Sequence, residues 1–242
     1  MKYARSGQER IQATRRARGN CPACDAEMIA RCGPKRVNHW AHKGRQHCDH
    51  WWEPETRWHR KWKNEFPIGW QETVHKDENG ERHIADLTTP SWLVIEFQHS
   101  PIKLQEIKKR TSFYKRIIWV IDGTRRKKDE NRFSYNWGPI TSERSVKDIE
   151  VLAKRAPYHG LLAEWAWIDQ TIVFDFNQWK EPEREAQKNL WIIHSHQHKN
   201  AKLAYQISRA EFVSFILLDQ TVPNFSYTNG PAKLDWPDRP IG

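Results

Sequence analysis

Hydrophobic and polar residues alternate along three stretches in the first half of the chain, and this pattern predicts β-strands. A tight turn at Asn79-Gly80 joins the first two. The predicted strands are "IGWQETVHK" (68–76), "ERHIADLTT" (81–89) and "SWLVIEFQH" (91–99).

Helical signals flank these strands on both sides. The stretch "EPETRWHRKWKNEF" (53–66) predicts a helix with Pro54 in its first turn and Pro67 just past its end. Ser100-Pro101 predicts the start of a second helix, "IKLQEIKKRTSFYKR" (102–116), and a buried strand, "IIWVIDG" (117–123), follows it.

The second half of the chain is less regular. Residues 123–150 are polar and predict loops, and the tail after residue 222 predicts an extended, proline-rich covering. A final helix is indicated by the capping box Ser208…Glu211. Strands are predicted at "WAWID" (165–169), "TIVFDF" (171–176) and "NLWIIHSH" (189–196).

The charge of the chain narrows the class of partner. Its 242 residues carry a net charge of +10, and they include 14 tryptophans, some of which could stack on bases. A basic balance of this size favours a polyanion, nucleic acid above all, over a merely solvated surface. No apolar run is long enough for a membrane span and no secretory leader is evident, so we expect a cytoplasmic protein without a membrane partner.

All four cysteines fall within the first 48 residues. Because we expect the chain to be cytoplasmic, where disulfides are rare, they favour metal binding. The pair in "CPAC" and the histidines in "HWAH" predict a structural zinc site. Its predicted ligands are Cys21, Cys24, His39 and His42. Cys48 could replace one histidine, and His47, His50 and Cys32 are further candidates.

Two acidic residues interrupt otherwise apolar strands. Alternation places Val94, Glu96 and Gln98 on one strand face, and Asp86 lies in the preceding strand. Antiparallel pairing would bring Asp86 and Glu96 together at neighbouring strand ends. Two carboxylates with room for water and phosphate suit Mg²⁺ or Mn²⁺.

The first predicted helix adds ionisable residues to a stripe that must face the core. Projection of the helix places Glu55, Trp58, His59, Trp62, Lys63 and Phe66 on one arc. A ladder of Glu, His and Lys on a solvated flank is the alternative. Beside Asp86 and Glu96, the stripe favours a site.

These motifs occur in the order typical of one family. "CPAC", "HWAH", "ETRWHRKWK", "RHIADL", "IEFQHSPI" and "KKRTSFY…IIWVID" together resemble the competence protein CoiA-like nucleases. The resemblance covers residues 1–122 well and the remainder weakly. It implies a restriction-endonuclease-like fold of the PD-(D/E)XK type, which is α/β with a mixed central sheet flanked by helices. We therefore expect a zinc-finger-like region at 1–50, a nuclease core at 51–125 and an α/β extension at 126–242.

The resemblance also implies roles for single residues. Asp86 and Glu96 would bind the catalytic metal, and Gln98 stands where most of the superfamily has lysine. Glu55, His59 and Lys63 would be accessory residues of the first helix, with Lys63 a candidate for the missing positive charge. Nucleic-acid contacts are expected at Arg82, Arg110 and Tyr114, although Arg110 could equally be structural.

The sequence therefore predicts a Mg²⁺- or Mn²⁺-dependent deoxyribonuclease with a structural Zn²⁺. A zinc-stapled module that binds nucleic acid without cutting it, and an RNase, are the alternatives. The alternating His194, His196 and His198 indicate a solvated strand face more than a second metal site. Asp175 indicates a hydrogen-bonded structural residue.

Overall fold

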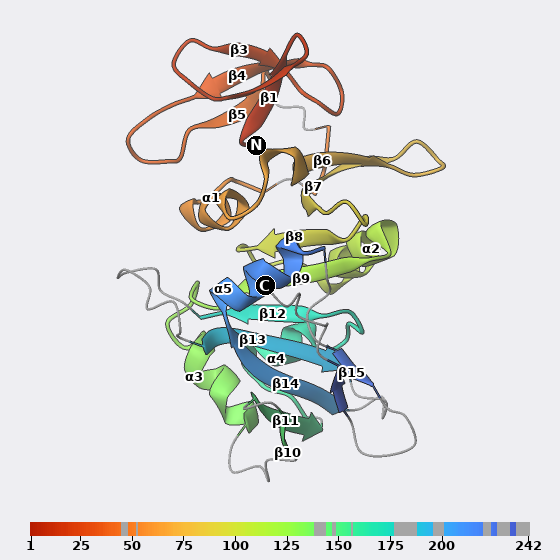
Figure 1. Ribbon diagram of the computed structural model, residues 1–242. Coiled ribbons are helices and arrows are strands. Elements are labelled where there is room, and N and C mark those ends of the chain that lie inside the picture. The colour runs from red at the N-terminus through yellow and green to blue at the C-terminus, as the bar shows by residue number, and fades with distance from the viewer. Residues whose placement is uncertain are drawn as a thin grey trace. The chain divides into compact units, whose positions relative to one another are not determined.

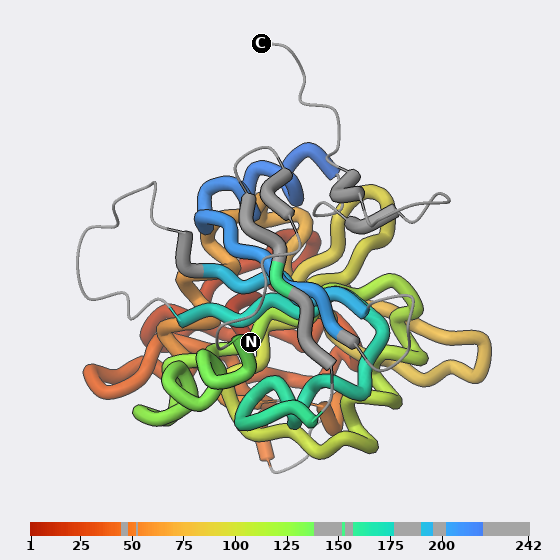
Figure 2. The backbone as a smooth tube through the Cα atoms, turned by 90° about the horizontal axis from the view of Figure 1, so that it is seen from below, coloured from red at the N-terminus to blue at the C-terminus, as the bar shows by residue number. Residues whose placement is uncertain are grey.

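A computed structural model of the chain is shown as a ribbon in Figure 1 and as a backbone tube in Figure 2. The chain is mixed α/β and separates into two compact units, Met1–Ser100 and Pro101–Gly242. This division falls inside the segment 51–125, so the three-part domain organisation stays a prediction. The structure describes residues 1–44, 48–51, 53–137, 144–146, 149–155, 157–176, 188–195, 201–219, 224–226 and 233–235.

The first unit begins with a five-stranded antiparallel sheet in the order β2-β1-β3-β4-β5 (Figure 1). The sequence pattern gave no sign of it, because strands such as "ERIQ" and "RGN" carry few apolar residues. Its strands are β1 (Tyr3–Ser6), β2 (Glu9–Gln12), β3 (Arg18–Asn20), β4 (Glu27–Arg31) and β5 (His39–His42).

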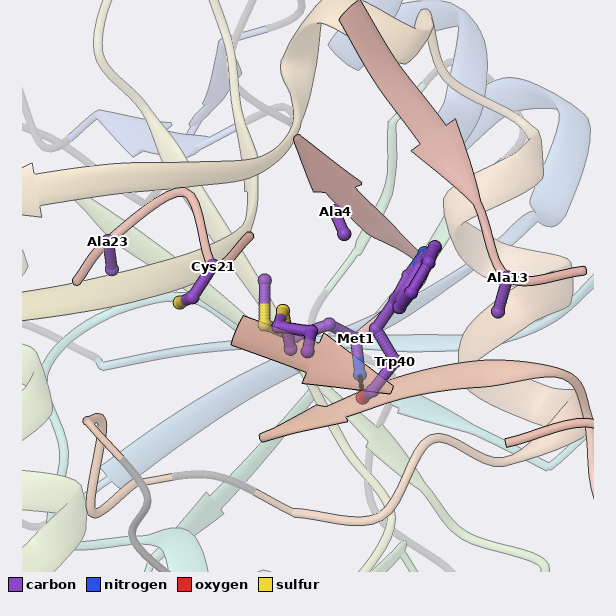
Figure 3. Close-up of a cluster of buried hydrophobic side chains, with 7 residues drawn as sticks. Met1, Ala4, Ala13, Cys21, Ala23 and Trp40 are labelled. Atoms are coloured by element: carbon purple, nitrogen blue, oxygen red, sulfur yellow. Dashed lines mark hydrogen bonds between the residues drawn. The ribbon is translucent and has the colours of Figure 1, made fainter. Parts of the chain in front are cut away.

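A small core supports this sheet, centred on the fully buried Trp40 (Figure 3). The indole Nε1 of Trp40 donates to the carbonyl of Ile11 at 3.0 Å. Gly19 of β3 lies so close to Ala4 that an added Cβ would stand 2.9 Å from the Cβ of Ala4. The core consists of Met1, Ala4, Ala13, Cys21, Ala23, Met28 and Trp40. So few apolar side chains make a core that gains from a metal staple.

The rest of the first unit is a helix followed by an antiparallel meander. Helix α1 (Arg57–Asn64) precedes a 3₁₀ turn, η1 (Ile68–Trp70), and the strands β6 (Gln71–Lys76), β7 (Arg82–Thr88) and β8 (Val94–Gln98). These elements confirm the predicted helix and three strands, with shorter bounds. The helix starts at Arg57 rather than Glu53, because Thr56 caps it.

The second unit is built on a sheet in which β12 and β9 pair in parallel and the other strands pair antiparallel. The order of its strands is β10-β11-β14-β13-β12-β9. They are β9 (Ile117–Asp122), β10 (Arg144–Val146), β11 (Ile149–Arg155), β12 (Ile172–Asp175), β13 (Lys188–Ser195) and β14 (Ala201–Ser208); β15 (Asn224–Ser226) and β16 (Lys233–Asp235) form a separate pair.

The helices of the second unit are α2 (Leu104–Tyr114), α3 (Asp129–Ser134), α4 (Gly160–Trp165) and α5 (Arg209–Leu217), with a 3₁₀ turn, η2 (Tyr135–Trp137). Helix α5 has the predicted box, in which Ser208 Oγ accepts from the Glu211 amide at 3.1 Å. Aromatic packing holds the unit together: the rings of Trp119 and Trp165 lie 5.3 Å apart.

Three predictions for the second half were wrong in part. The stretch "WAWID" is not a strand, because Trp165 completes a helix whose buried residues Leu161, Leu162 and Trp165 have helical spacing. Helix α3 and strands β10 and β11 occupy much of the predicted loop region, and β14 had no counterpart. The predicted solvated face is wrong for His194, which is buried, whereas His196 and His198 lie outside the described residues. Asp175 is fully buried, which is compatible with the structural role expected for it.

None of the helices in the described ranges has the length and apolar character that a bilayer crossing requires.

Candidate functional site

Helix α1 points two ionisable residues into the first unit. Thr56 Oγ1 accepts from the His59 amide at 3.2 Å, and the Thr56 amide donates to His59 Nδ1 at 3.4 Å, which completes a capping box. This cap fixes the rotation of the helix. His59 and Lys63, one turn apart, are therefore buried between the helix and the meander, with 3% and 2% of their surfaces exposed.

Lys63 is the centre of an ionic cluster. Its Nζ lies 2.8 Å from Glu55 Oε2, 3.0 Å from Glu72 Oε1 and 3.4 Å from Asp86 Oδ1. Arg60 adds a second cation at 3.1 Å from Glu55 Oε1. We call Glu55, Lys63, Glu72 and Asp86 the lysine cluster. It brings together three of the predicted site residues and has more carboxylates than ammonium groups.

The charges of the lysine cluster hold one another ionised. Burial alone would lower the pKa of Lys63, but Glu55, Glu72 and Asp86 outweigh it and raise that pKa well above 10.5. Burial would raise the pKa of Glu55 and of Glu72, but the Lys63 ammonium outweighs it and holds both below 4.5. Lys63, Glu55 and Glu72 are therefore charged at neutral pH and do not share protons.

Glu72 joins this cluster from an irregular position in β6. Its backbone φ is +50°, and the pairing with β7 passes from Gln71 to Thr73 without it, although the register on the two sides of Glu72 is the same. Its carboxylate accepts from the amides of Lys2 at 2.6 Å and Tyr3 at 2.9 Å. Glu72 thereby ties strand β1 to the lysine cluster.

Asp86 and Glu96 meet where β7 and β8 separate. The register pairs Leu87 with Ile95, so one further step places Asp86 opposite Glu96, as predicted. At that step the two strands are joined by hydrogen bonds from backbone amides to side-chain carboxylates. The Asp86 amide donates to Glu96 Oε1 at 3.2 Å, and the Phe97 amide donates to Asp86 Oδ2 at 3.0 Å. The two carboxylates are thus fixed on adjacent strands.

Gln98 does not face Lys63 but a carboxylate outside the predicted set. Its amide Nε2 donates to Glu53 Oε2 at 3.1 Å and to the Ser100 carbonyl at 2.8 Å. Glu53 Oε1 lies 2.5 Å from His59 Nε2, which also donates to the Phe97 carbonyl at 2.8 Å. Hydrogen bonds from Gln98 to Glu53 and between Glu53 and His59 therefore link the end of β8 to α1.

This linkage sets the charge of His59. Burial disfavours its charged form, but the hydrogen bond and the negative charge of Glu53 outweigh burial, so the pKa of His59 is raised above 6.5. Burial likewise would raise the pKa of Glu53, whereas His59 holds it below 4.5. His59 and Glu53 therefore form an ion pair at mildly acid pH.

The three residues predicted to contact nucleic acid differ in setting. Arg82 Nη1 donates to the Ala23 carbonyl at 2.8 Å, inside the Cys21–Cys24 loop. Arg110 is buried and pairs with Glu106 one turn earlier in α2, which supports its structural alternative. Tyr114 is buried as well, at the end of α2. A role in nucleic-acid binding stays a prediction for all three.

Four sulfur and nitrogen donors gather near the N-terminal sheet. Cys21, Cys24, His42 and Cys48 place one ligand atom each within 4.8 Å of all the others. The Sγ atoms of Cys21 and Cys48 lie 3.6 Å apart, and Cys24 Sγ lies 3.3 Å from His42 Nε2. Three thiols and one imidazole in this arrangement could hold a zinc ion.

The structure replaces one predicted zinc ligand. His39 lies outside this group, and its Nδ1 donates to the Val37 carbonyl at 2.9 Å. The physical reason is strand geometry: His39 and His42 are three residues apart on β5, so they point to opposite faces. Cys48, the alternative that the sequence offered, completes the set; His47 lies outside the described residues.

Sequence reasoning missed Glu53 and Glu72. Glu72 carried the same signal as Glu96, because alternation places it on the face of Trp70 and Val74. Glu53 carried no periodic signal, since it precedes the helix and its contacts come from the fold.

Two domain models of one family match the chain: competence protein CoiA, N-terminal domain, over residues 4–50, and competence protein CoiA, nuclease-like domain, over residues 84–142. Over these two stretches the chain is similar to the CoiA family. The first match contains the zinc-type cluster of Cys21, Cys24, His42 and Cys48; the second contains Asp86, Glu96 and Gln98.

Competence protein CoiA of Bacillus subtilis (strain 168) is 26% identical to the chain over 148 residues. The alignment covers 54% of this chain and 39% of that CoiA, so the chain spans about two fifths of its relative. No solved structure is significantly similar to the chain. The second matching model describes a nuclease-like domain, and it covers most of β7 and all of β8, the strands that carry Asp86 and Glu96.

Proposed function

We propose that the protein is a metal-dependent nuclease that hydrolyses DNA phosphodiester bonds during competence, recombination or defence. The observation that carries the proposal is the pairing of Asp86 with Glu96 beside Lys63. The order of helix α1, three antiparallel strands and helix α2 supports a restriction-endonuclease-like core. The nuclease-like match over residues 84–142 supports it independently.

The donor set fits a hard divalent cation. Four carboxylates, from Glu55, Glu72, Asp86 and Glu96, share the site with the cations Lys63 and Arg60, which leaves an excess of negative charge and oxygen donors. Asp86 and Glu96 would hold the ion. When bound, Mg²⁺ or Mn²⁺ lowers the pKa of a coordinated water and neutralises charge on the phosphate.

The protein side chains would supply position and charge. Lys63 places an ammonium beside Asp86. In most of the superfamily this charge comes from a lysine at the position that Gln98 occupies here. Gln98 instead binds Glu53 and so keeps the end of β8 against α1. We infer that the Lys63 ammonium offsets phosphate charge and that Gln98 positions the strand.

Binding of the substrate would rest on the basic first unit. Residues 1–50 contain 11 Lys and Arg against 4 Asp and Glu, which accounts for most of the net charge of +10. Arg15, Arg31 and Arg36 are exposed, in turns and at a strand end of the N-terminal sheet. Exposed arginines of this kind bind phosphates without reading sequence. The proposed division of labour is phosphate binding by this sheet and cleavage at Asp86 and Glu96.

Cleavage of labelled single-stranded, duplex, branched and RNA substrates in Mg²⁺ and Mn²⁺ tests the proposal. Asp86→Asn and Glu96→Gln should each reduce DNA cleavage by about 100-fold or more, because metal stabilisation of the transition state is worth several kcal/mol. Glu78→Gln, an exposed change in the β6–β7 turn, is the matched control and should leave cleavage unchanged. Full cleavage by both site variants would refute the proposal, and cleavage of RNA alone would make the protein an RNase.

A zinc-stapled module that binds nucleic acid without cutting it is the second candidate. One observation favours it: the neutral Gln98 is engaged by Glu53 and Ser100, and Asp86 and Glu96 already accept backbone hydrogen bonds. Salt-sensitive DNA binding without cleavage in either metal would support this candidate.

A further inference from the structure

A second group of metal-ligating side chains lies in the first unit and shares no residue with the zinc-type cluster. The donor atoms of His50, Glu81 and His83 all lie within 4.8 Å of one another. His83 Nε2 is 2.8 Å from Glu81 Oε1, and His50 Nε2 is 4.0 Å from the same oxygen. The three residues come from two places: the segment after Cys48 and the start of β7.

Asp49 fixes the orientation of His83. Asp49 Oδ1 accepts from His83 Nδ1 at 2.8 Å, and its carboxylate also accepts from the amides of Trp51 and Ile84, each at 2.9 Å. The ring of Trp51 stacks on the imidazole. Because Nδ1 donates to Asp49, Nε2 is presented to Glu81 and His50. In metal sites, an imidazole that binds the ion through one nitrogen commonly donates its other N–H to a carboxylate, as His83 does to Asp49.

The spacing suits a small divalent ion. Ligands 2.0–2.1 Å from a tetrahedral ion stand about 3.3 Å from one another. The two measured separations, 2.8 and 4.0 Å, lie on either side of that value. His50 therefore needs only a small rotation to complete the site, and its side chain is 70% exposed, so the rotation is unobstructed on the solvent side.

The group is closed on one side and open on the other. The His83 side chain is fully buried, whereas the Glu81 side chain is 47% exposed. Three protein ligands with access to solvent leave the fourth position of a tetrahedral ion for water. The zinc-type cluster of Cys21, Cys24, His42 and Cys48 instead offers four protein ligands. His83 and Asp86 are three residues apart on β7, so they point to opposite faces and the group is separate from the lysine cluster.

We propose that His50, Glu81 and His83 bind one zinc-class divalent ion, with Asp49 as the residue that positions His83. Two imidazoles and one carboxylate form a donor set that zinc, cobalt and nickel prefer over magnesium or calcium. The ion ties the segment 48–51 to β7, the strand that carries Asp86. The ion is exchangeable, because two ligands, His50 and Glu81, and the open position face solvent.

Metal titration of the full chain tests the inference, with Zn²⁺ and Co²⁺ as the probes. The reduced wild type should take up a second ion whose Co²⁺ spectrum lacks the sulfur-to-metal charge-transfer band of the thiolate cluster. His50→Ala and Glu81→Gln should each lower the affinity for this second ion by about 100-fold or more, while the charge-transfer band persists. Both residues are exposed enough for the variants to fold.

His39→Ala is the matched control, since His39 is a half-exposed histidine that the structure places outside both groups. It should bind as many ions as the wild type. Cys24→Ser should weaken the charge-transfer band and keep the second ion. Equal uptake by wild type, His50→Ala and Glu81→Gln would overturn the inference, and the group would then be an ion-free network of charges.

Discussion

Lys63 and Asp86 are in ionic contact, with 3.4 Å between Nζ and Oδ1, although they come from a helix and a strand 23 positions apart in the sequence. The contact places a permanent positive charge at the predicted metal-binding carboxylate. Because Glu55 and Glu72 hold Lys63 from the other side, the ammonium cannot leave Asp86 without exposing two buried carboxylates. The charge near Asp86 is thus built into the fold.

Replacement of Lys63 by methionine should destabilise the protein by about 3–5 kcal/mol, because it leaves Glu55 and Glu72 buried without their partner. Lys61→Met, an exposed change on the same helix, should cost within about 0.5 kcal/mol. Urea unfolding measures both. The double variant Lys63→Met with Glu72→Gln should regain part of the stability but none of the cleavage. Recovered cleavage would show that Lys63 has only a structural role.

Glu53→Gln should lower the pKa of His59, because Glu53 is the group that outweighs burial. With the pKa of His59 raised and that of Glu53 lowered, the pair contributes its full stability between pH 4.5 and 6.5. It loses that stability as pH rises through the folded pKa of His59 or falls through the folded pKa of Glu53. In the variant, burial alone should bring the pKa of His59 below 6.5. Histidine NMR titration measures the shift, and an unchanged His59 pKa would contradict the assignment.

His75 is an internal reference for that titration. Burial holds its pKa below 6.5, and its Nε2 lies 2.8 Å from Thr88 Oγ1, away from Glu53. Its titration should be the same in wild type and Glu53→Gln.

Cys48→Ser should weaken zinc binding by the Cys and His cluster, whereas His39→Ala should not. The cobalt-substituted protein distinguishes the two ligand sets, because the charge-transfer band of three thiolates should lose about a third of its intensity in Cys48→Ser. A chelator should also lower the unfolding temperature of the wild type, because a zinc ion on this cluster would stabilise the small core around Trp40. Loss of zinc in His39→Ala would restore the ligand set first predicted from the sequence.

Replacement of Arg15 and Arg36 by alanine should weaken DNA binding at low salt and reduce the slope of log K against log salt by about 2, one unit for each lost phosphate contact. The exposed pair Lys127 and Lys128 in the second unit is the matched control. Equal losses in the two double variants would show that binding follows net charge and not the N-terminal sheet.

The sequence was sufficient to locate Asp86 and Glu96, because each is an acid in an apolar, alternating strand and the turn lengths set the pairing. It also located Lys63 and His59, whose helical spacing survives although the helix starts four residues later than expected. Hydrophobic periodicity predicts the position of a side chain correctly where the residue is buried and its helix or strand is regular.

It failed where contacts depend on irregular backbone. Glu72 reaches Lys63 from a strand position with φ at +50°, a backbone conformation that the sequence pattern does not predict for a residue other than glycine. Glu53 reaches His59 and Gln98 from a segment outside any element. The N-terminal sheet was missed because its strands are short and polar, with a core of seven residues in place of an amphipathic pattern.

The crossed hydrogen bonds between β7 and β8 restrict how a cation can be held. Asp86 gives one oxygen to the Phe97 amide and Glu96 gives one to the Asp86 amide, so chelation by both oxygens of either carboxylate would break a strand contact. Calcium commonly takes carboxylates bidentately, whereas magnesium accepts single oxygens in an octahedron completed by water. At the proposed site, the parting of β7 and β8 would therefore favour magnesium over calcium, because it leaves one free oxygen on each carboxylate.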